Sequence, residues 1–330
     1  MSLEILRDRA LYRANFANLG AYFDFAQSYL HFMDDRSNYQ AEIVCQNERS
    51  YRFYQYKSDG NHRITRPINN DLWLPEAQYI AQLGNFRAIL DDLQAGRFPN
   101  PAHKTLVSRY IYTTQQTVGA ALDSLDADRV NTARKLNGDV FEQFIKQLIQ
   151  ATGVDCESGV VKVPIRDEHG AELFKVQYQH DLLVRSGDDL KIIGSVKTSS
   201  KDRLDKIFVD KFLYSQITGT DTPHIAICLN DVQRGKRTAG TSTTSPTYRV
   251  GSTFLPGRFK AYTIKLSALD GVYYCDLRPN MSTDPLLSAH IKSIDDLFYG
   301  DLTRFLKTAP PAPVEVELGA ELHTAPEISD

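Results

Sequence analysis

The fold of this chain is decided by residues 174–198, which read FKVQYQHDLLVRSGDDLKIIGSVKT. From Phe174 to Val184 the apolar residues share the even positions and polar residues fill most of the odd ones. The segment Leu190–Thr198 alternates in the same way, and such alternation is typical of a strand with one apolar and one polar face. The Ser-Gly-Asp-Asp segment between them favours a tight turn, so the two segments predict a β-hairpin.

The polar side of this hairpin carries reactive groups. Asp181 on the first strand and Ser195 and Lys197 on the second are expected to project from the same face. A sheet that only builds a core has no need of a carboxylate beside an ammonium. We therefore expect this face to hold a functional site.

The segments around the hairpin predict a mixed sheet with helices packed against it, in the order helix, strand, strand, strand, helix, strand. An apolar stripe at i, i+3, i+4, i+7 and i+8 starts at Phe141, in a helix that begins near Asn137 or Asp139 and ends at Gly153. Glu142 lies at the edge of this stripe. The other elements are expected over 160–165 (strand), 201–217 (helix opened by Ser199 or Ser200 and closed by Gly219) and 224–229 (fully buried strand).

The rest of the chain divides into three parts. Residues 1–135 predict an α-rich N-terminal region, with helices over 3–35, 76–95 and 103–135, and its role in DNA contact or dimerisation stays open. Its aromatic segment at 51–56 fits a strand or a DNA-facing surface, although such aromatic residues more often fill a core. Residues 136–306 form the expected catalytic core, which includes a second hairpin from 259–266 and 272–277 and a terminal helix over 291–306. The acidic, proline-containing residues 307–330 are expected to be disordered.

The charge is unevenly distributed along the chain. The net charge is −3, but five acids and no lysine or arginine lie in 308–330, so the remainder is positive. Residues 232–269 contain seven basic residues and no acid, which favours a polyanionic partner. We expect DNA contacts from this basic segment, and its candidate residues are Arg234, Lys236, Arg237, Arg249, Arg258 and Lys260.

Composition excludes several classes of protein. No apolar run approaches the roughly 20 residues that span a bilayer, and the first residues lack a signal-peptide core. The four cysteines are far apart, which argues against a zinc site or disulfide framework and favours a reducing cytoplasm.

The polar face has the side chains that phosphodiester hydrolysis requires. A divalent metal held by carboxylates neutralises the phosphate and activates water, and a nearby lysine assists both tasks. Asp181, Lys197, Glu142 and an acid of the following helix could form such a set.

This order of elements, with an Asp on one strand and the position of an acid-x-Lys motif on the next, resembles the PD-(D/E)xK nuclease superfamily, in particular type II restriction endonucleases. The resemblance covers roughly residues 137–230. Two positions depart from the pattern, because His180 replaces the usual Pro and Ser195 replaces the acid before Lys197. One branch of these enzymes has the same Ser-x-Lys and moves the acid onto the next helix. In this chain the relocated acid would be Asp210, with Asp202 as the competing candidate, and Glu142 matches that branch's glutamate.

The resemblance implies a Mg²⁺-dependent, sequence-specific endonuclease that cuts double-stranded DNA as a homodimer, leaving 5′-phosphate ends. Asp181 and Asp210 would bind the metal, Lys197 would orient water, Glu142 would assist, and Ser195 would leave room for the helix carboxylate. Two alternatives stay open. One is a nuclease of the same fold without a fixed site, acting in repair or defence. The other is a DNA-binding protein on a decayed nuclease scaffold.

Overall fold

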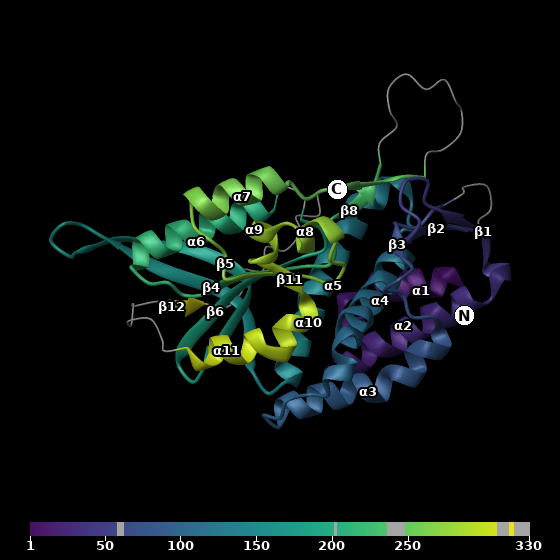
Figure 1. The fold of residues 1–330 in the computed structure, drawn as a ribbon, viewed down its shortest axis with the longest axis horizontal. Helices are drawn as coiled ribbons and strands as arrows, with labels where there is room; N and C mark the ends of the chain where they lie inside the picture. Colours follow the sequence, from purple (N-terminus) through teal and green to yellow (C-terminus); the bar gives the residue numbers. More distant parts are fainter. Residues whose placement is uncertain (58–62, 201–202, 236–247, 309–316, 320–330) are drawn as a thin grey trace, which may run out of the picture.

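A computed structural model describes residues 1–57, 63–200, 203–235, 248–308 and 317–319, and its centre is a mixed sheet (Figure 1). In the described part of the chain this sheet contains β4 (Asp155–Arg166), β5 (Glu172–Ser186), β6 (Asp189–Lys197), β7 (His224–Cys228), β10 (Gly271–Tyr274), β11 (Ile291–Ser293) and β12 (Glu317–Gly319). The strands lie in the order β11-β10-β7-β6-β5-β4-β12. The pairs β12–β4, β4–β5 and β5–β6 are antiparallel, and β6, β7, β10 and β11 run parallel. The predicted mixed sheet is confirmed.

Helices cover both faces of the sheet. One face carries α5 (Val130–Ala151), α10 (Ile294–Asp296), a π-helical turn (Leu297–Asp301) and α11 (Leu302–Lys307). The other carries α6 (Leu204–Thr218), α7 (Pro256–Lys265), α8 (Pro279–Thr283) and α9 (Pro285–Ser288), and Figure 1 shows the two layers above and below the strands. Alternate residues of β7 therefore enter opposite cores, Ile225 on the α5 side and Ala226 on the α6 side. This double cover explains why β7 is buried throughout, as predicted.

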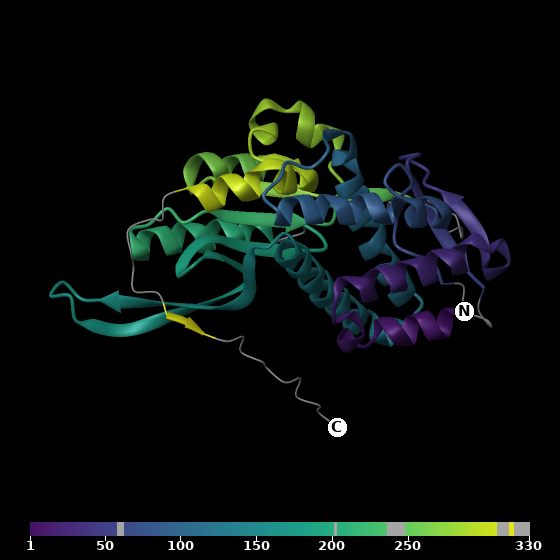
Figure 2. The same cartoon turned by 90° about the horizontal axis from the view of Figure 1, so that it is seen from below.

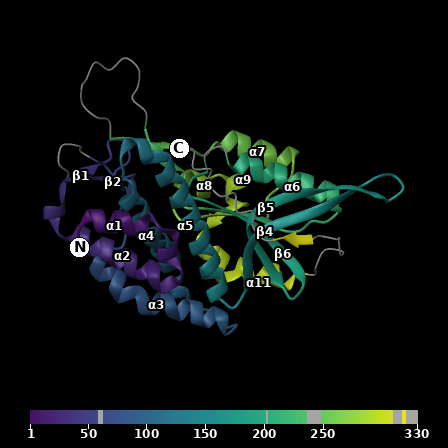
Figure 3. The ribbon, with the colours of Figure 1, turned by 180° about the vertical axis from the view of Figure 1, so that it is seen from behind.

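The N-terminal region packs its helices against α5. It contains α1 (Leu3–Ala10), α2 (Leu19–Asp34), α3 (Glu76–Gln94) and α4 (Lys104–Leu122), with 3₁₀ turns at Arg13–Phe16, Arg36–Asn38, Pro101–His103 and Ala127–Arg129. Tyr22 of α2 stacks on Phe144 of α5 with ring centroids 4.6 Å apart, and its hydroxyl donates to the Val140 carbonyl at 2.9 Å. Figure 3 shows α5 between this region and the sheet. The two parts of the chain thus share one hydrophobic core.

The N-terminal region also contains a small antiparallel sheet that the sequence pattern did not predict as such. Its strands are β1 (Tyr39–Val44), β2 (Tyr51–Tyr56) and β3 (Ile68–Asn69), in that order. The aromatic side chains of β2 are buried, as expected. A further two-stranded ribbon consists of β8 (Val232–Arg234) and β9 (Val250–Ser252).

The β4–β5 hairpin extends well beyond the rest of the sheet, and Figure 2 shows it projecting away from the helices. β4 is longer than the predicted strand at 160–165, and the backbone of β12 pairs along it. Residues 317–319 of the predicted disordered tail therefore belong to the sheet, whereas the predictions for 309–316 and 320–330 lie outside the described residues. No helix in the described residues is long and apolar enough to cross a membrane.

Several predicted boundaries were wrong. Helix α5 begins at Val130, so Asn137 and Asp139 lie inside it and cap nothing. Helix α6 begins at Leu204 with Arg203 at its N-cap, and the hydroxyls of Ser199 and Ser200 instead share hydrogen bonds with Thr253. By contrast, Gly219 ends α6 in the left-handed conformation (φ 66°), as predicted.

Two further predictions were wrong at the C-terminal side of the core. Residues 259–266 lie in and just after helix α7, because Pro256 occupies its first turn and Phe259 and Tyr262 pack on Phe208 of α6. Residues 272–277 therefore have no hairpin partner there, and β10 pairs in parallel with β7 and β11. The predicted terminal helix over 291–306 begins instead with strand β11, whose Ile291 completes the apolar core beneath α9.

Candidate active site

The candidate site is built around an irregularity in β5. The β4–β5 pairing passes from Glu157↔Leu183 to Gly159↔His180, so β5 carries one more residue than β4 across this interval. This β-bulge spans Asp181 and reverses the facing of the strand. Leu182 enters the α5-side core, whereas Tyr178 packs with the α6-side core although both have even numbers. The uniform alternation expected for Phe174–Val184 was therefore wrong.

The two central strands separate at the same place. Pairing between β5 and β6 runs from Ser186↔Asp189 to Leu182↔Gly194, and beyond Gly194 β6 continues alongside β7. The Val196 N–H faces the opening and donates to Asp181 Oδ2 at 2.7 Å. A side-chain carboxylate thus replaces the backbone acceptor that a continuing β5 would have supplied. We call the place beyond Gly194 where β5 and β6 separate the fork. The bulge and the fork together fix the Asp181 carboxylate at the end of β6.

Lys197, the last residue of β6, lies in this fork. Its Nζ contacts Asp181 Oδ2 and lies 3.2 Å from Glu142 Oε1 of α5. The three side chains are 19–30% exposed, so solvent reaches the group from one side. The predicted meeting of Asp181, Lys197 and Glu142 is present in the structure.

The electrostatics of the group follow from its burial. Burial and the nearby Asp181 carboxylate raise the pKa of Glu142 to about 7, although Lys197 opposes the shift. Burial alone would lower the pKa of Lys197, but the Asp181 and Glu142 carboxylates outweigh it and hold that pKa above its usual value. Two carboxylates therefore share one ammonium, and the charge balance of the site favours binding of a further cation.

The remaining predicted residues of this group lie at different distances from it. Ser195 is half-buried on β6, two residues before Lys197 and opposite Ala226 of β7. Asp210 lies on α6, where burial raises its pKa and Lys206 opposes the rise, and it interacts electrostatically with Tyr178. Within the described residues no hydrogen bond or ion pair joins Asp210 to Asp181, Lys197 or Glu142. Asp202 lies outside the described residues.

Two histidines near the fork belong to the core. His180 and His224 are at most 4% exposed, and their rings form an edge-to-face contact at 6.3 Å. Burial lowers the pKa of His180 to about 4 and that of His224 to about 3, so both are neutral at pH 7. The prediction that both histidines are core residues is confirmed by their burial.

The predicted DNA-binding residues separate into two places. Arg234 lies on β8, where its guanidinium stacks on Phe53 and donates to backbone carbonyls of residues 64 and 65. Arg249 is exposed just before β9. On α7, Arg258 pairs with Asp205 at 3.2 Å and Lys260 with Asp284, so these two cations have acidic partners. Lys236 and Arg237 lie outside the described residues.

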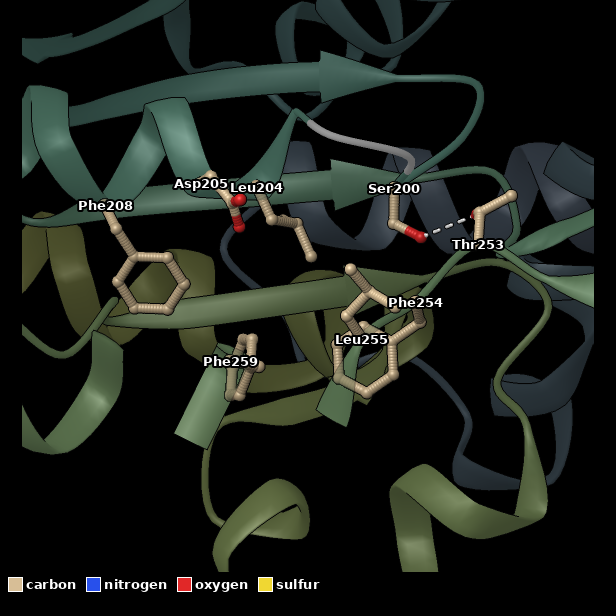
Figure 4. A pocket seen from close by; sticks show the side chains of 8 residues that line it. All are labelled: Ser200, Leu204, Asp205, Phe208, Thr253, Phe254, Leu255 and Phe259. Atoms are coloured by element: carbon tan, nitrogen blue, oxygen red, sulfur yellow. Dashed lines mark hydrogen bonds between the residues drawn. The ribbon is translucent and has the colours of Figure 1, made fainter. Parts of the chain in front are cut away.

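Sequence reasoning missed a hydrogen-bonded support beneath the site. The hydroxyl of Thr253 lies 3.1 Å from that of Ser200 and donates to the Asp231 carbonyl at 2.9 Å (Figure 4). The segment that follows Lys197 is thereby tied to the end of β7. Figure 4 also shows the small pocket between α6 and α7 that Ser200 and Thr253 border, and its walls are mainly apolar. Because Thr253 is 53 residues from Ser200, no local signal could have revealed this contact.

The donor set is compatible with Mg²⁺. This ion commonly takes one or two carboxylates from the protein and completes its shell with water and substrate phosphate. Asp181 and Glu142 are two such carboxylates, and a cation between them would oppose the burial and the Asp181 charge that raise the pKa of Glu142. No cluster of three or more histidine, cysteine or acidic side chains suited to a metal occurs in the described part of the chain. A metal here would therefore depend on water and substrate for most of its ligands.

Comparison of the structure with solved structures identifies the fold. A crystal structure of the type IIP restriction endonuclease Kpn2I superposes with a TM-score of 0.64 over 94% of this chain and 99% of that chain, at 17% sequence identity. The chain therefore has a restriction-endonuclease fold. A complex of the restriction endonuclease PspGI with substrate DNA also matches, with a TM-score of 0.38, 13% identity, and coverage of 69% of this chain and 89% of that chain. No protein-family model and no curated protein sequence matches this chain.

Proposed function

We propose that this protein is a Mg²⁺-dependent, site-specific endonuclease that hydrolyses double-stranded DNA, as a member of the Ser-x-Lys branch of the PD-(D/E)xK superfamily. The observation that carries the proposal is the fork between β5 and β6. There Asp181, Lys197 and Glu142 meet on a partly exposed surface, within a fold shared with a type IIP restriction endonuclease. These groups suit phosphodiester hydrolysis, because one cation and two carboxylates can orient water and balance charge at a phosphate.

Each residue has a distinct task in this proposal. Asp181 and Glu142 would hold the metal, which supplies a water of lowered pKa and neutralises phosphate charge. The Lys197 ammonium binds a non-bridging phosphate oxygen and orients the attacking water, because it already lies between both carboxylates. Asp181 also holds β6 in place through the Val196 N–H, so that the lysine projects from a fixed backbone.

Two parts of the proposal go beyond this local geometry. Asp210 of α6, which has no hydrogen bond or ion pair to the fork residues in the described part of the chain, completes the metal shell when metal and DNA are bound. The protein acts as a homodimer, because cutting both strands of a palindromic site calls for two copies of the site related by a two-fold axis.

A decisive experiment is incubation of the purified protein with phage DNA, with and without Mg²⁺, followed by gel electrophoresis. Discrete fragments that depend on Mg²⁺ are expected, and sequencing their ends gives the recognition site. A Mg²⁺-dependent smear would refute site specificity and favour a non-specific nuclease. Intact DNA with every metal, together with salt-sensitive DNA binding, would refute the nuclease and favour a binding protein that lacks its third carboxylate.

A further inference from the structure

Helix α5 carries a row of charged side chains that extends past the candidate active site. Residues 135, 139, 142 and 146 are spaced by three or four and therefore share one face of the helix. Lys146 Nζ contacts Ser158 Oγ of β4 at 3.1 Å, and Glu142 contacts Lys197 at the end of β6. Asp139 is close enough to Glu142 to raise its pKa further. The row thus crosses the sheet from β4 to the end of β6, and Lys135 extends it by one further helical turn towards the start of α5.

Lys135 is an exposed cation without an acidic partner in the described part of the chain. Its side chain is exposed, and no hydrogen bond or ion pair to it occurs within the described ranges of the chain. The first turn of α5 contains no acidic residue and no side-chain cap. The helix dipole acts mainly within the first turn, so Lys135 in the second turn is little affected by it. Asp139 lies one turn further along the same face without an ion pair to Lys135 in the described residues, so the ammonium is free to bind an external anion.

The segment before α5 is connected to the β8–β9 ribbon, which carries two of the predicted DNA-binding residues, Arg234 and Arg249. The segment at residues 63–65 joins the start of α5 to the β8–β9 ribbon, because Arg63 contacts Asp126 and Arg234 donates to the Thr65 carbonyl at 3.0 Å. Exposed Arg249 lies at the far end of this connection. These contacts connect the segment before α5 to the ribbon, while Glu142, further along α5, contacts Lys197 at the fork.

We propose that Lys135 binds a DNA phosphate a few nucleotides from the one that is cleaved and so positions the duplex along α5. This inference rests on the proposed nuclease function and assigns it a contact residue outside the basic segment of residues 232–269. Lys135 lies seven residues before Glu142, which is about 10 Å along the helix axis. A phosphate at that distance is roughly three nucleotide steps from the scissile one along the duplex.

The test compares the salt dependence of DNA binding in Lys135→Ala, Lys135→Arg and the wild-type protein. Binding to a fluorescein-labelled, mixed-sequence duplex is followed by anisotropy with Ca²⁺ in place of Mg²⁺, over about 50 to 300 mM salt. One lost phosphate contact lowers the slope of log Kd against log salt by about 0.9. We expect this reduction in Lys135→Ala and an unchanged slope in Lys135→Arg. Lys307→Ala, at the exposed end of α11 near the start of β6 and outside the basic segment, is the matched control and keeps the wild-type slope.

The outcomes separate this inference from the function on which it rests. A wild-type protein that binds the duplex, with the same slope in Lys135→Ala, overturns the role of Lys135 and leaves the nuclease intact. Equal loss of slope in Lys135→Ala and Lys307→Ala overturns it as well, because the effect would then be one of total charge. A wild-type protein that neither binds nor cleaves DNA overturns both proposals together. Thermal unfolding of each variant identifies any loss that comes from misfolding.

Discussion

Replacement of Lys197 by methionine tests the candidate site most directly. Methionine keeps most of the length of the side chain and removes its charge. The Lys197 ammonium lies 3.2 Å from a Glu142 oxygen, and we take the same separation for a bound phosphate oxygen. At an effective dielectric constant of about 20, a charge pair at this distance is worth roughly 5 kcal/mol. Screening in a partly exposed site lowers this to about 3 kcal/mol, which is a 10²- to 10³-fold loss of rate.

The rate is measured as single-turnover cleavage of supercoiled plasmid with excess enzyme and Mg²⁺. DNA affinity with Ca²⁺ is expected to stay within a few-fold of wild type, because one cation of many is removed. Lys162→Met, on the half-buried β4 position away from the fork, controls for loss of a strand lysine. The reasoning fails if Lys197→Met is folded and cleaves within tenfold of the wild-type rate.

Three other predictions concern the structure around the site. Gly194→Ala places a methyl group about 3.0 Å from the Leu182 side chain at the fork. We expect it to lower the free energy of unfolding in urea by about 1 kcal/mol and to slow cleavage. An unchanged free energy of unfolding and cleavage rate would contradict tight packing at this position. Tyr51→Phe removes the 2.7 Å hydrogen bond that the Tyr51 hydroxyl donates to buried Asp276, and it should lower the free energy of unfolding by about 1–3 kcal/mol in the same assay. An unchanged free energy would mean that water replaces the hydroxyl. The pKa of His224 falls from about 6.5 unfolded to about 3 folded, so the unfolded state binds more protons and stability drops as pH decreases below about 6.5. His224→Gln should lose less stability than wild type between pH 6.5 and 5, and parallel curves would argue against a neutral buried histidine.

The sequence by itself determined the elements whose signals are local. Period-two alternation located β5 and β6, a continuous apolar run located β7, and Gly219 marked the end of α6. These features depend on side-chain spacing within a few residues, and that spacing is the same in the isolated segment and in the folded protein. Because β5 and β6 are joined by a short turn, the approach of Asp181 to Lys197 was also within reach of the sequence.

Local signals were ambiguous where two structures fit the same residues. Residues 259–266 contain β-branched and aromatic residues that favour a strand, but their apolar members also fit one face of a helix. The packing of Phe259 against Phe208 of α6 decided for helix α7. Intrinsic preference is a weak determinant when tertiary contacts compete with it.

Only the tertiary structure decided how the site is assembled. The bulge at Asp181 depends on the register with β4, and the fork depends on β6 leaving β5 to follow β7. The start of α5 at Val130 placed Lys135 in the same row as Glu142, and α6 positions Asp210 without a hydrogen bond or ion pair to the fork residues in the described part of the chain. Such features result from pairings and packing between distant segments. They have no signature in residue spacing, because the energy that selects them is shared among elements that meet only in the folded chain.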